Sequence, residues 1–197
     1  MTKLTTLKDL DFEDALQLHD EGAAFVDLRD TDDYLEVHIP GALGLLYEGG
    51  PGMPVRARDC IPLATGLILL DFDSIDLDVA GAALKGKGFA VWGRVSDGIN
   101  QWAAQGGRPS STEVVTDMKP PPGTILDVAD PGARPPKDAT RVPAENMWDA
   151  AEDFAYQGRI VLAAGYGVRA ALTVGMLERA GVKEIVFWKT RPAPPRL

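Results

Sequence analysis

The chain contains a single thiol, and cysteine is the side chain that most readily supplies a covalent nucleophile. Cys60 lies in the segment RARDCIPLATG, ahead of an apolar run and without a glycine-rich turn directly after it. Arg56 and Arg58 would lower its pKa if the segment folded them inward, because positive charge favours the thiolate. The position favours an ordinary loop or partly buried thiol over a catalytic one. A single cysteine excludes an internal disulfide and favours a reducing compartment, so we predict a cytoplasmic protein.

Two other patterns resemble ligand sites. An acidic run comprises Asp71, Asp73, Asp76 and Asp78. Clustered carboxylates attract hard cations, but the spacing of a calcium loop is absent, and acidic residues also stabilise the first turn of a helix. Residues 165–167, Gly-Tyr-Gly, carry only part of the glycine spacing of a dinucleotide loop. We therefore predict no metal and no cofactor.

The charge balance limits the partners. The chain has 29 acidic and 20 basic residues, a formal net charge of −9, which disfavours binding to nucleic acid or an anionic membrane through a general electrostatic field. Residues 1–16 lack an apolar core of signal-peptide length. No apolar run approaches the roughly 20 residues that span a bilayer. We expect a soluble protein with neither a nucleic-acid nor a membrane partner.

Short apolar strands alternate with amphipathic helical segments along the chain, which predicts an α/β fold with parallel sheets. In the first half we predict a helix at 12–21, strands at 23–26, 66–70 and 89–92, and helices from 75 and at 97–105. In the second half we predict strands at 124–128, 159–163 and 184–188, a helix at 143–156, and a helix that ends near 180.

The two halves repeat one pattern. The matching segments are FVDLRD at 25–30 with ILDVAD at 125–130, LILLD at 67–71 with IVLAA at 160–164, and Leu84 with Leu177. The first match lies 100 positions apart and the other two 93. A constant offset across a strand, a loop and a helix predicts two copies of one α/β unit, the second a few residues shorter between its first two strands. The alternative is a single doubly wound sheet whose strands are merely alike.

These matches and the composition between them give the expected domains. Residues from Gly106 to Gly123 are rich in Gly, Pro, Ser and Thr and have no long apolar period. We therefore place the first domain at 1–107, a linker at 108–123, and a shortened second domain at 124–197.

The segment Phe25–Ala42, FVDLRDTDDYLEVHIPGA, resembles the opening signature of rhodanese domains. The matching residues are Asp27, Arg29, Tyr34, His38, Ile39, Pro40, Gly41 and Ala42. Val37 replaces the usual glycine, and Gly88–Trp102 resembles the closing strand, turn and tryptophan-bearing helix of the family. We expect Asp27 to tie down the turn after its strand, and His38 to bridge that turn to its neighbours in a structural role. The resemblance implies two tandem rhodanese-like domains, each a small parallel sheet flanked by helices.

In rhodanese-like enzymes a loop between a strand and a helix carries the cysteine that takes up sulfane sulfur as a persulfide. Amides of that loop at a helix N-terminus stabilise a thiolate, a persulfide or an anionic donor, and a basic residue adds charge. The corresponding loop here is Ala164, Gly165, Tyr166, Gly167, Val168 and Arg169. Ala164 stands at the cysteine position, and Asp71 stands there in the first half. Neither side chain can carry sulfur.

Two explanations account for Ala164. Under the first, which we favour because Tyr166 also departs from common versions of the loop, the protein is a catalytically inactive tandem-domain member of the family. It would then act as an anion-binding, partner-binding or regulatory module. Under the second, it is a thiosulfate or 3-mercaptopyruvate sulfurtransferase whose loop cysteine was replaced by alanine. Both predict a small anion or sulfur donor at loop 164–169, and a protein partner is compatible with both. A phosphatase-like use of the loop would also need the cysteine.

Overall fold

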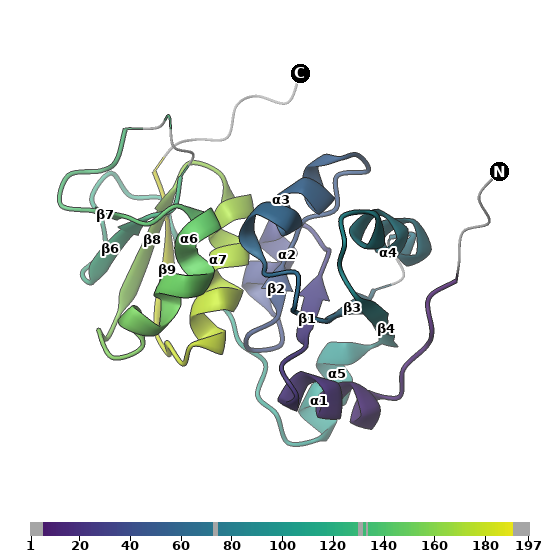
Figure 1. The fold of residues 1–197 in the computed structure, drawn as a ribbon. Helices are drawn as coiled ribbons and strands as arrows, with labels where there is room; N and C mark the ends of the chain where they lie inside the picture. Colours follow the sequence, from purple (N-terminus) through teal and green to yellow (C-terminus); the bar gives the residue numbers. More distant parts are fainter. Residues whose placement is uncertain (1–5, 73–74, 130–131, 133, 191–197) are drawn as a thin grey trace.

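The computed structural model describes residues 6–72, 75–129, 132 and 134–190. They form two parallel β-sheets with helices packed against them, so the predicted α/β class is confirmed (Figure 1). None of the helices in this part of the chain is long and apolar enough to cross a bilayer.

The first sheet has the strand order β2-β1-β3-β4, with all strands parallel. Its strands are β1 (Ala24–Asp27), β2 (Leu43–Gly44), β3 (Leu67–Asp71) and β4 (Val91–Ser96). Its helices are α1 (Phe12–Asp20), α2 (Thr31–Glu36), α3 (Gly52–Cys60), α4 (Leu77–Gly86) and α5 (Gly98–Ala104). Apolar side chains of α1 and α5 pack on one face, and those of α2, α3 and α4 belong to the core on the other. Cover on both faces is why β1 and β3 are apolar along nearly their whole length.

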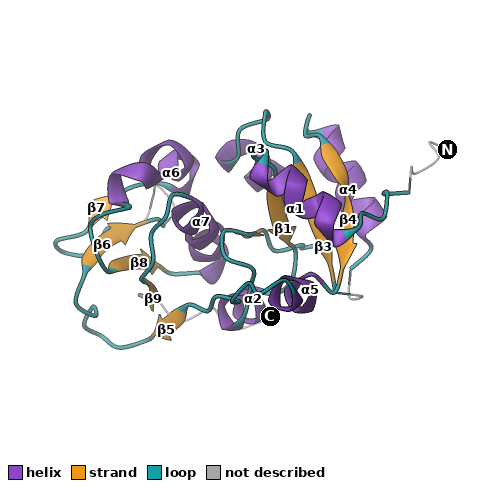
Figure 2. Cartoon of the chain, turned by 90° about the horizontal axis from the view of Figure 1, so that it is seen from below, coloured by secondary structure: helices purple, strands orange, loops and turns teal. Residues whose placement is uncertain are grey.

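The second sheet has the order β5-β9-β8-β6-β7, again with parallel pairing throughout. Its strands are β5 (Glu113–Val115), β6 (Thr124–Asp127), β7 (Thr140–Arg141), β8 (Ile160–Ala164) and β9 (Ile185–Lys189). Its helices are α6 (Ala144–Ala150), the 3₁₀ helix η1 (Ala151–Phe154) and α7 (Gly167–Arg179). Strand β5 lies inside the segment predicted as the linker, and it pairs with β9 at the edge of the sheet (Figure 2).

The strand orders establish the duplication. The order β2-β1-β3-β4 recurs as β7-β6-β8-β9, with β5 added beside β9. Strands β1 and β6 start 100 residues apart, and β3 and β8 start 93 apart, as the sequence matches require. Leu84 in α4 and Leu177 in α7 are both fully buried. The predicted pair of α/β units is confirmed, and the single doubly wound sheet is wrong.

Helices α2, α3, α6 and α7 lie between the two sheets (Figures 1 and 2). One continuous apolar cluster includes side chains of all four helices and of both sheets. Residues 170–177 of α7 are buried along two full turns. Because α7 packs against its own sheet on one side and the first half on the other, it is apolar nearly all round.

The contact between α7 and β2 is close enough to require residues without side chains. A Cβ atom on Gly175 would lie 2.2 Å from the carbonyl oxygen of Ala42. A Cβ atom on Gly44 would lie 2.9 Å from the Cβ of Ala171. Glycine at these two positions therefore lets the backbone of one half rest directly on a helix of the other.

Candidate functional site

A cavity of about 510 Å³ lies between the two halves, at the carboxyl ends of β6 and β8. The first half contributes Glu48 and residues of α3, among them Val55, Arg56, Asp59 and Cys60. The second half contributes Asp127, Ala129, Arg134, Pro136, Glu145, Thr190 and most of the loop that follows β8. The carboxyl ends of parallel strands are the usual place for a ligand site in α/β proteins, because the strand-to-helix loops meet there.

The loop after β8 holds the predicted anion-binding residues. Ala164, Gly165, Tyr166, Val168 and Arg169 all line the cavity. Tyr166 is the residue before the first turn of α7, and its side chain makes no capping hydrogen bond. The first backbone N–H groups of a helix have no partner within the helix, so this end of α7 presents donors and a positive dipole.

Gly167 is the member of the predicted loop that does not line the cavity. It packs against the first half instead, where a Cβ atom would lie 2.3 Å from the Cγ2 methyl of Thr31. Its glycine is therefore explained by a close approach to α2 as well as by any role in the loop.

Arg169, the predicted basic residue of the loop, is engaged by an acidic neighbour that the sequence did not point to. Its guanidinium forms two parallel hydrogen bonds with Glu145 of α6, from Nη1 to Oε2 at 2.9 Å and from Nη2 to Oε1 at 2.7 Å. The hydrogen bonds from Arg169 lower the pKa of Glu145 below its ordinary value, although burial works in the opposite direction. Glu145 is therefore ionised at neutral pH, and much of the charge of Arg169 is neutralised.

Cys60 lines the same cavity at the last residue of α3 and is 4% exposed. Burial raises the pKa of this thiol to about 12, with Glu145 and Asp59 raising it further and Arg169 and Arg56 offsetting only part. Arg56 instead donates to Glu48 and to the carbonyl of Leu46. The condition under which arginines would activate Cys60 is therefore not met, and Cys60 is a protonated thiol at neutral pH.

The equivalent junction in the first half lies outside the cavity lining. Asp71 ends β3, and one of its carboxylate oxygens lies 3.8 Å from Arg94 of β4. Asp76 caps α4 by accepting a hydrogen bond from the Val79 N–H at 3.2 Å. Asp73 falls outside the described residues. In the described part of the chain, no three His, Cys, Asp or Glu side chains are grouped so that they could hold a metal ion.

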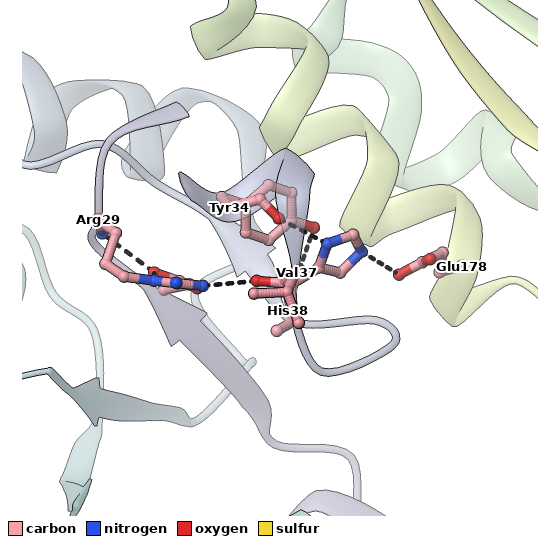
Figure 3. A network of polar contacts seen from close by, with 7 residues as sticks. Arg29, Tyr34, Val37, His38 and Glu178 are labelled. Carbon is pink, nitrogen blue, oxygen red and sulfur yellow. Dashed lines mark hydrogen bonds and ion pairs between the residues drawn. The ribbon is translucent and has the colours of Figure 1, made fainter. Parts of the chain in front are cut away.

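No residue of the Phe25–Ala42 signature lines the cavity, and its polar side chains form a hydrogen-bonded network of their own. The carboxylate of Asp27 accepts from the backbone N–H of Arg29 at 3.0 Å and from its guanidinium at 2.6 Å. The same guanidinium donates to the carbonyl of Val37 at 2.7 Å (Figure 3). Asp27 thus holds the turn after β1, and Arg29 ties that turn to the end of α2.

His38 connects this network to the second half. Its ring is fully buried, with Nδ1 2.7 Å from the carbonyl oxygen of Tyr34 and Nε2 3.1 Å from a carboxylate oxygen of Glu178 on α7 (Figure 3). The ring thus lies between two hydrogen-bond acceptors, one in the first half and one in the second. Pro40 and Gly41 form the turn that follows, and Gly41 has a φ of 77°.

Glu178 is a residue that sequence reasoning missed, and it collects three donors. It accepts from His38, from the backbone N–H of Gly41 at 2.7 Å, and from the hydroxyl of Ser110 at 2.5 Å. Burial raises the pKa of this carboxyl, but the hydrogen bonds from His38, Ser110 and Gly41 together bring it below its ordinary value. One carboxylate of α7 therefore fixes both the first half and the segment that joins the halves.

Comparisons with known proteins gave structural matches only. No protein-family model and no curated protein sequence matches the chain. The structure is similar to the crystal structure of thiosulfate sulfurtransferase from Pseudomonas aeruginosa, with 17% identity and a TM-score of 0.42, covering 93% of this chain and 40% of that one. It is also similar to the crystal structure of SseA from Escherichia coli, which is described with the "Rhodanese" fold of 3-mercaptopyruvate sulfotransferases, with 16% identity and a TM-score of 0.40. That match covers 96% of this chain and 100% of the other. The chain thus spans two fifths of the length of the Pseudomonas protein.

Proposed function

We propose that this chain is a rhodanese-like tandem-domain protein that, with alanine at residue 164, does not transfer sulfur. We further propose that it binds a small ligand with an anionic group in the cavity at loop 164–169. The observation that carries the proposal is the junction between β8 and α7. An uncapped helix N-terminus, Arg169 and the cavity meet there, and the residue at the strand end is Ala164.

The absence of a usable nucleophile supports the first part of the proposal, that the protein does not transfer sulfur. Persulfide formation needs a thiolate, and a methyl side chain at residue 164 has no lone pair and no ionisable proton. Cys60 is the other candidate in the cavity, but a thiol with a pKa of about 12 is about one part in 10⁵ thiolate at pH 7. Neither residue supplies the chemistry that the family uses.

The cavity walls support the second part of the proposal, that the protein binds a ligand with an anionic group. Amides at the start of a helix favour an anionic group, and a guanidinium adds charge and a planar pair of donors. Apolar groups from Val55, Pro136 and Val168 line the same space and would contact the body of a small molecule. An anionic group beside loop 164–169 with an apolar body above it fits these walls.

The proposed lack of sulfurtransferase activity is tested by introducing a thiol at residue 164. The variant Ala164→Cys should form no thiocyanate from thiosulfate and cyanide above the rate of the parent protein. The matched control is Asp71→Cys, which places a thiol at the equivalent strand end in the first half. Thiocyanate formation by Ala164→Cys but not by Asp71→Cys would favour the alternative, a sulfurtransferase whose cysteine was replaced.

The proposed ligand binding is tested on the parent protein with propane-1-sulfonate as an anionic probe. Its titration should produce saturable shifts in the amide NMR signals of residues 166–169. Arg169→Ala should weaken the apparent affinity by about tenfold, the usual cost of a lost charge-assisted hydrogen bond. Saturable binding that is unchanged in Arg169→Ala contradicts the proposal, and so does the absence of binding by both this probe and its ammonium-bearing analogue taurine.

A further inference from the structure

The Arg169–Glu145 pair makes the cavity unlike a simple anion site. Both side chains line the cavity, and their relative exposures of 22% and 32% leave them accessible to a ligand. Their two parallel hydrogen bonds, at 2.9 and 2.7 Å, have the geometry of a strong bidentate pair. An anion that enters the cavity therefore finds Arg169 already paired with the carboxylate of Glu145.

The remaining charges of the cavity are also mixed. Among the described residues that line it, the carboxylates are Glu48, Asp59, Asp127 and Glu145, and the guanidinium groups are Arg56, Arg134 and Arg169. Arg56 pairs with Glu48 at 3.0 Å on the first-half wall, and Asp127 is held by Arg141 at 2.6 Å. With Arg141 counted as the partner of Asp127, the described residues supply four carboxylates and four guanidinium groups, so a molecule with negative charge alone meets carboxylates as well as guanidinium groups.

We propose that the ligand of this cavity is dipolar: a small molecule with one acidic group and one ammonium or guanidinium group, which inserts between Arg169 and Glu145. The acidic group takes the guanidinium of Arg169 together with the amides at the start of α7. The cationic group takes the carboxylate of Glu145. This inference rests on the proposed binding function and names the class of molecule that the site accepts.

The physical reason is the cost of an unpaired charge. An anion that displaces Glu145 from Arg169 leaves a partly buried carboxylate without its partner, which offsets much of the gain. A dipolar ligand replaces one ion pair by two, so that both Arg169 and Glu145 keep a partner. Its separate charges also match the presence of both acidic and basic side chains in the lining.

The test compares two probes of nearly the same shape. Taurine has a sulfonate and an ammonium group, and propane-1-sulfonate has a methyl group where taurine has the ammonium. We expect taurine to bind the parent protein at least about tenfold more tightly by isothermal titration calorimetry, which is the typical effect of one charge-assisted hydrogen bond. Propylammonium, the cation alone, should bind more weakly than taurine.

The variant Glu145→Gln should remove the preference. Taurine and propane-1-sulfonate should then bind within about threefold of each other, and propane-1-sulfonate should bind more tightly than it binds the parent protein, because Arg169 has lost its competing carboxylate. Glu13→Gln changes an exposed carboxylate on α1, outside the cavity lining; it is the matched control and should keep the parent preference for taurine.

The outcomes separate the two proposals. If propane-1-sulfonate binds the parent protein at loop 164–169 as tightly as taurine does, the dipolar ligand is wrong and the binding function stands. If neither probe binds the parent protein, both proposals fail. The comparison of probes on the parent protein needs no variant, so it decides the matter even if Glu145→Gln does not fold.

Discussion

The strand–helix junctions after β3 and β8 occupy equivalent places in the duplicated unit but are built in opposite ways. The same number of residues separates Asp71 from Leu84 and Ala164 from Leu177. Helix α7 nevertheless begins three residues after its strand and α4 six, so α7 begins about one helical turn earlier along the chain. The N-terminus of α7 therefore follows its strand within three residues.

The two helix ends also differ in what satisfies their amides. In the first half, the carboxylate of Asp76 accepts from the Val79 N–H in the first turn of α4 at 3.2 Å. In the second half, Tyr166 supplies no side-chain cap, and the helix end opens on the cavity. The comparison teaches that equivalent helices of one repeated unit can begin either with a side-chain cap or uncapped beside a cavity, depending on a few side chains at a single junction.

The largest expected effect concerns the face of α7 that contacts the first half. The comparison is with the equivalent position of α4. Glu178→Ala should lower the free energy of unfolding by about 3 kcal/mol, because buried His38 and the N–H of Gly41 lose their acceptor. The matched control is Lys85→Ala at the equivalent, exposed position of α4, which should change it by less than about 0.5 kcal/mol. Urea unfolding measures both. Equal effects would mean that the two helices are used alike.

The same contact should weaken in acid. The pKa of Glu178 lies below its ordinary value in the folded protein. A carboxyl of this kind stabilises fully above its unfolded pKa, and the contribution is lost as the pH falls through the folded pKa. The difference in unfolding free energy between the parent protein and Glu178→Gln should therefore shrink as the pH falls below about 5. A difference that grows below about pH 5 contradicts the assignment.

The next effect concerns close packing. Gly175→Ala should cost about 2 kcal/mol in a urea titration, since the new methyl group would overlap the carbonyl of Ala42. The equivalent residue of α4, Ala82, is exposed and already carries that methyl group. Gly86→Ala, at the end of α4 with no atom within 4 Å of the added Cβ, is the control and should be neutral or slightly stabilising. Similar losses in both variants would contradict the difference between the two helices.

The smallest effect tests the caps themselves. Asp76→Ala should destabilise the protein by about 1 kcal/mol through the lost cap of α4. Tyr166→Asp should give α7 the kind of cap that α4 has, leave stability equal or slightly higher, and weaken propane-1-sulfonate binding by placing a carboxylate at the helix end. Thermal unfolding and calorimetry check the two outcomes. Unchanged sulfonate binding in Tyr166→Asp would show that the ligand is bound elsewhere.

Much of the architecture was predictable because it depends on local patterns. The apolar strands at the two sheet centres, and the offsets that relate them, identify the repeated unit directly in the sequence. The loop after β8 was also found, because Gly165 to Arg169 stands between a strand and a helix. These local patterns do not show which residues contact each loop, because the contacting residues come from other parts of the chain.

The elements and residues that were missed show the same limit. Helix α3 contains Gly52 and Pro54 in its first turn, where proline is tolerated, and the buried series Met53, Ala57 and Cys60 was the signal that could have revealed it. Strand β5 has only three residues. Glu145 and Glu178 carry no sequence signal, since Glu178 and His38 are 140 positions apart and meet only when the two halves dock.

The most direct test of the account is an amide NMR titration of the labelled parent protein with taurine. Saturable shifts are expected at Gly167, Val168 and Arg169 at the uncapped end of α7, with unchanged signals at residues 77–79 at the capped end of α4. Shifts concentrated at 77–79, or spread equally over both helix ends, would contradict it.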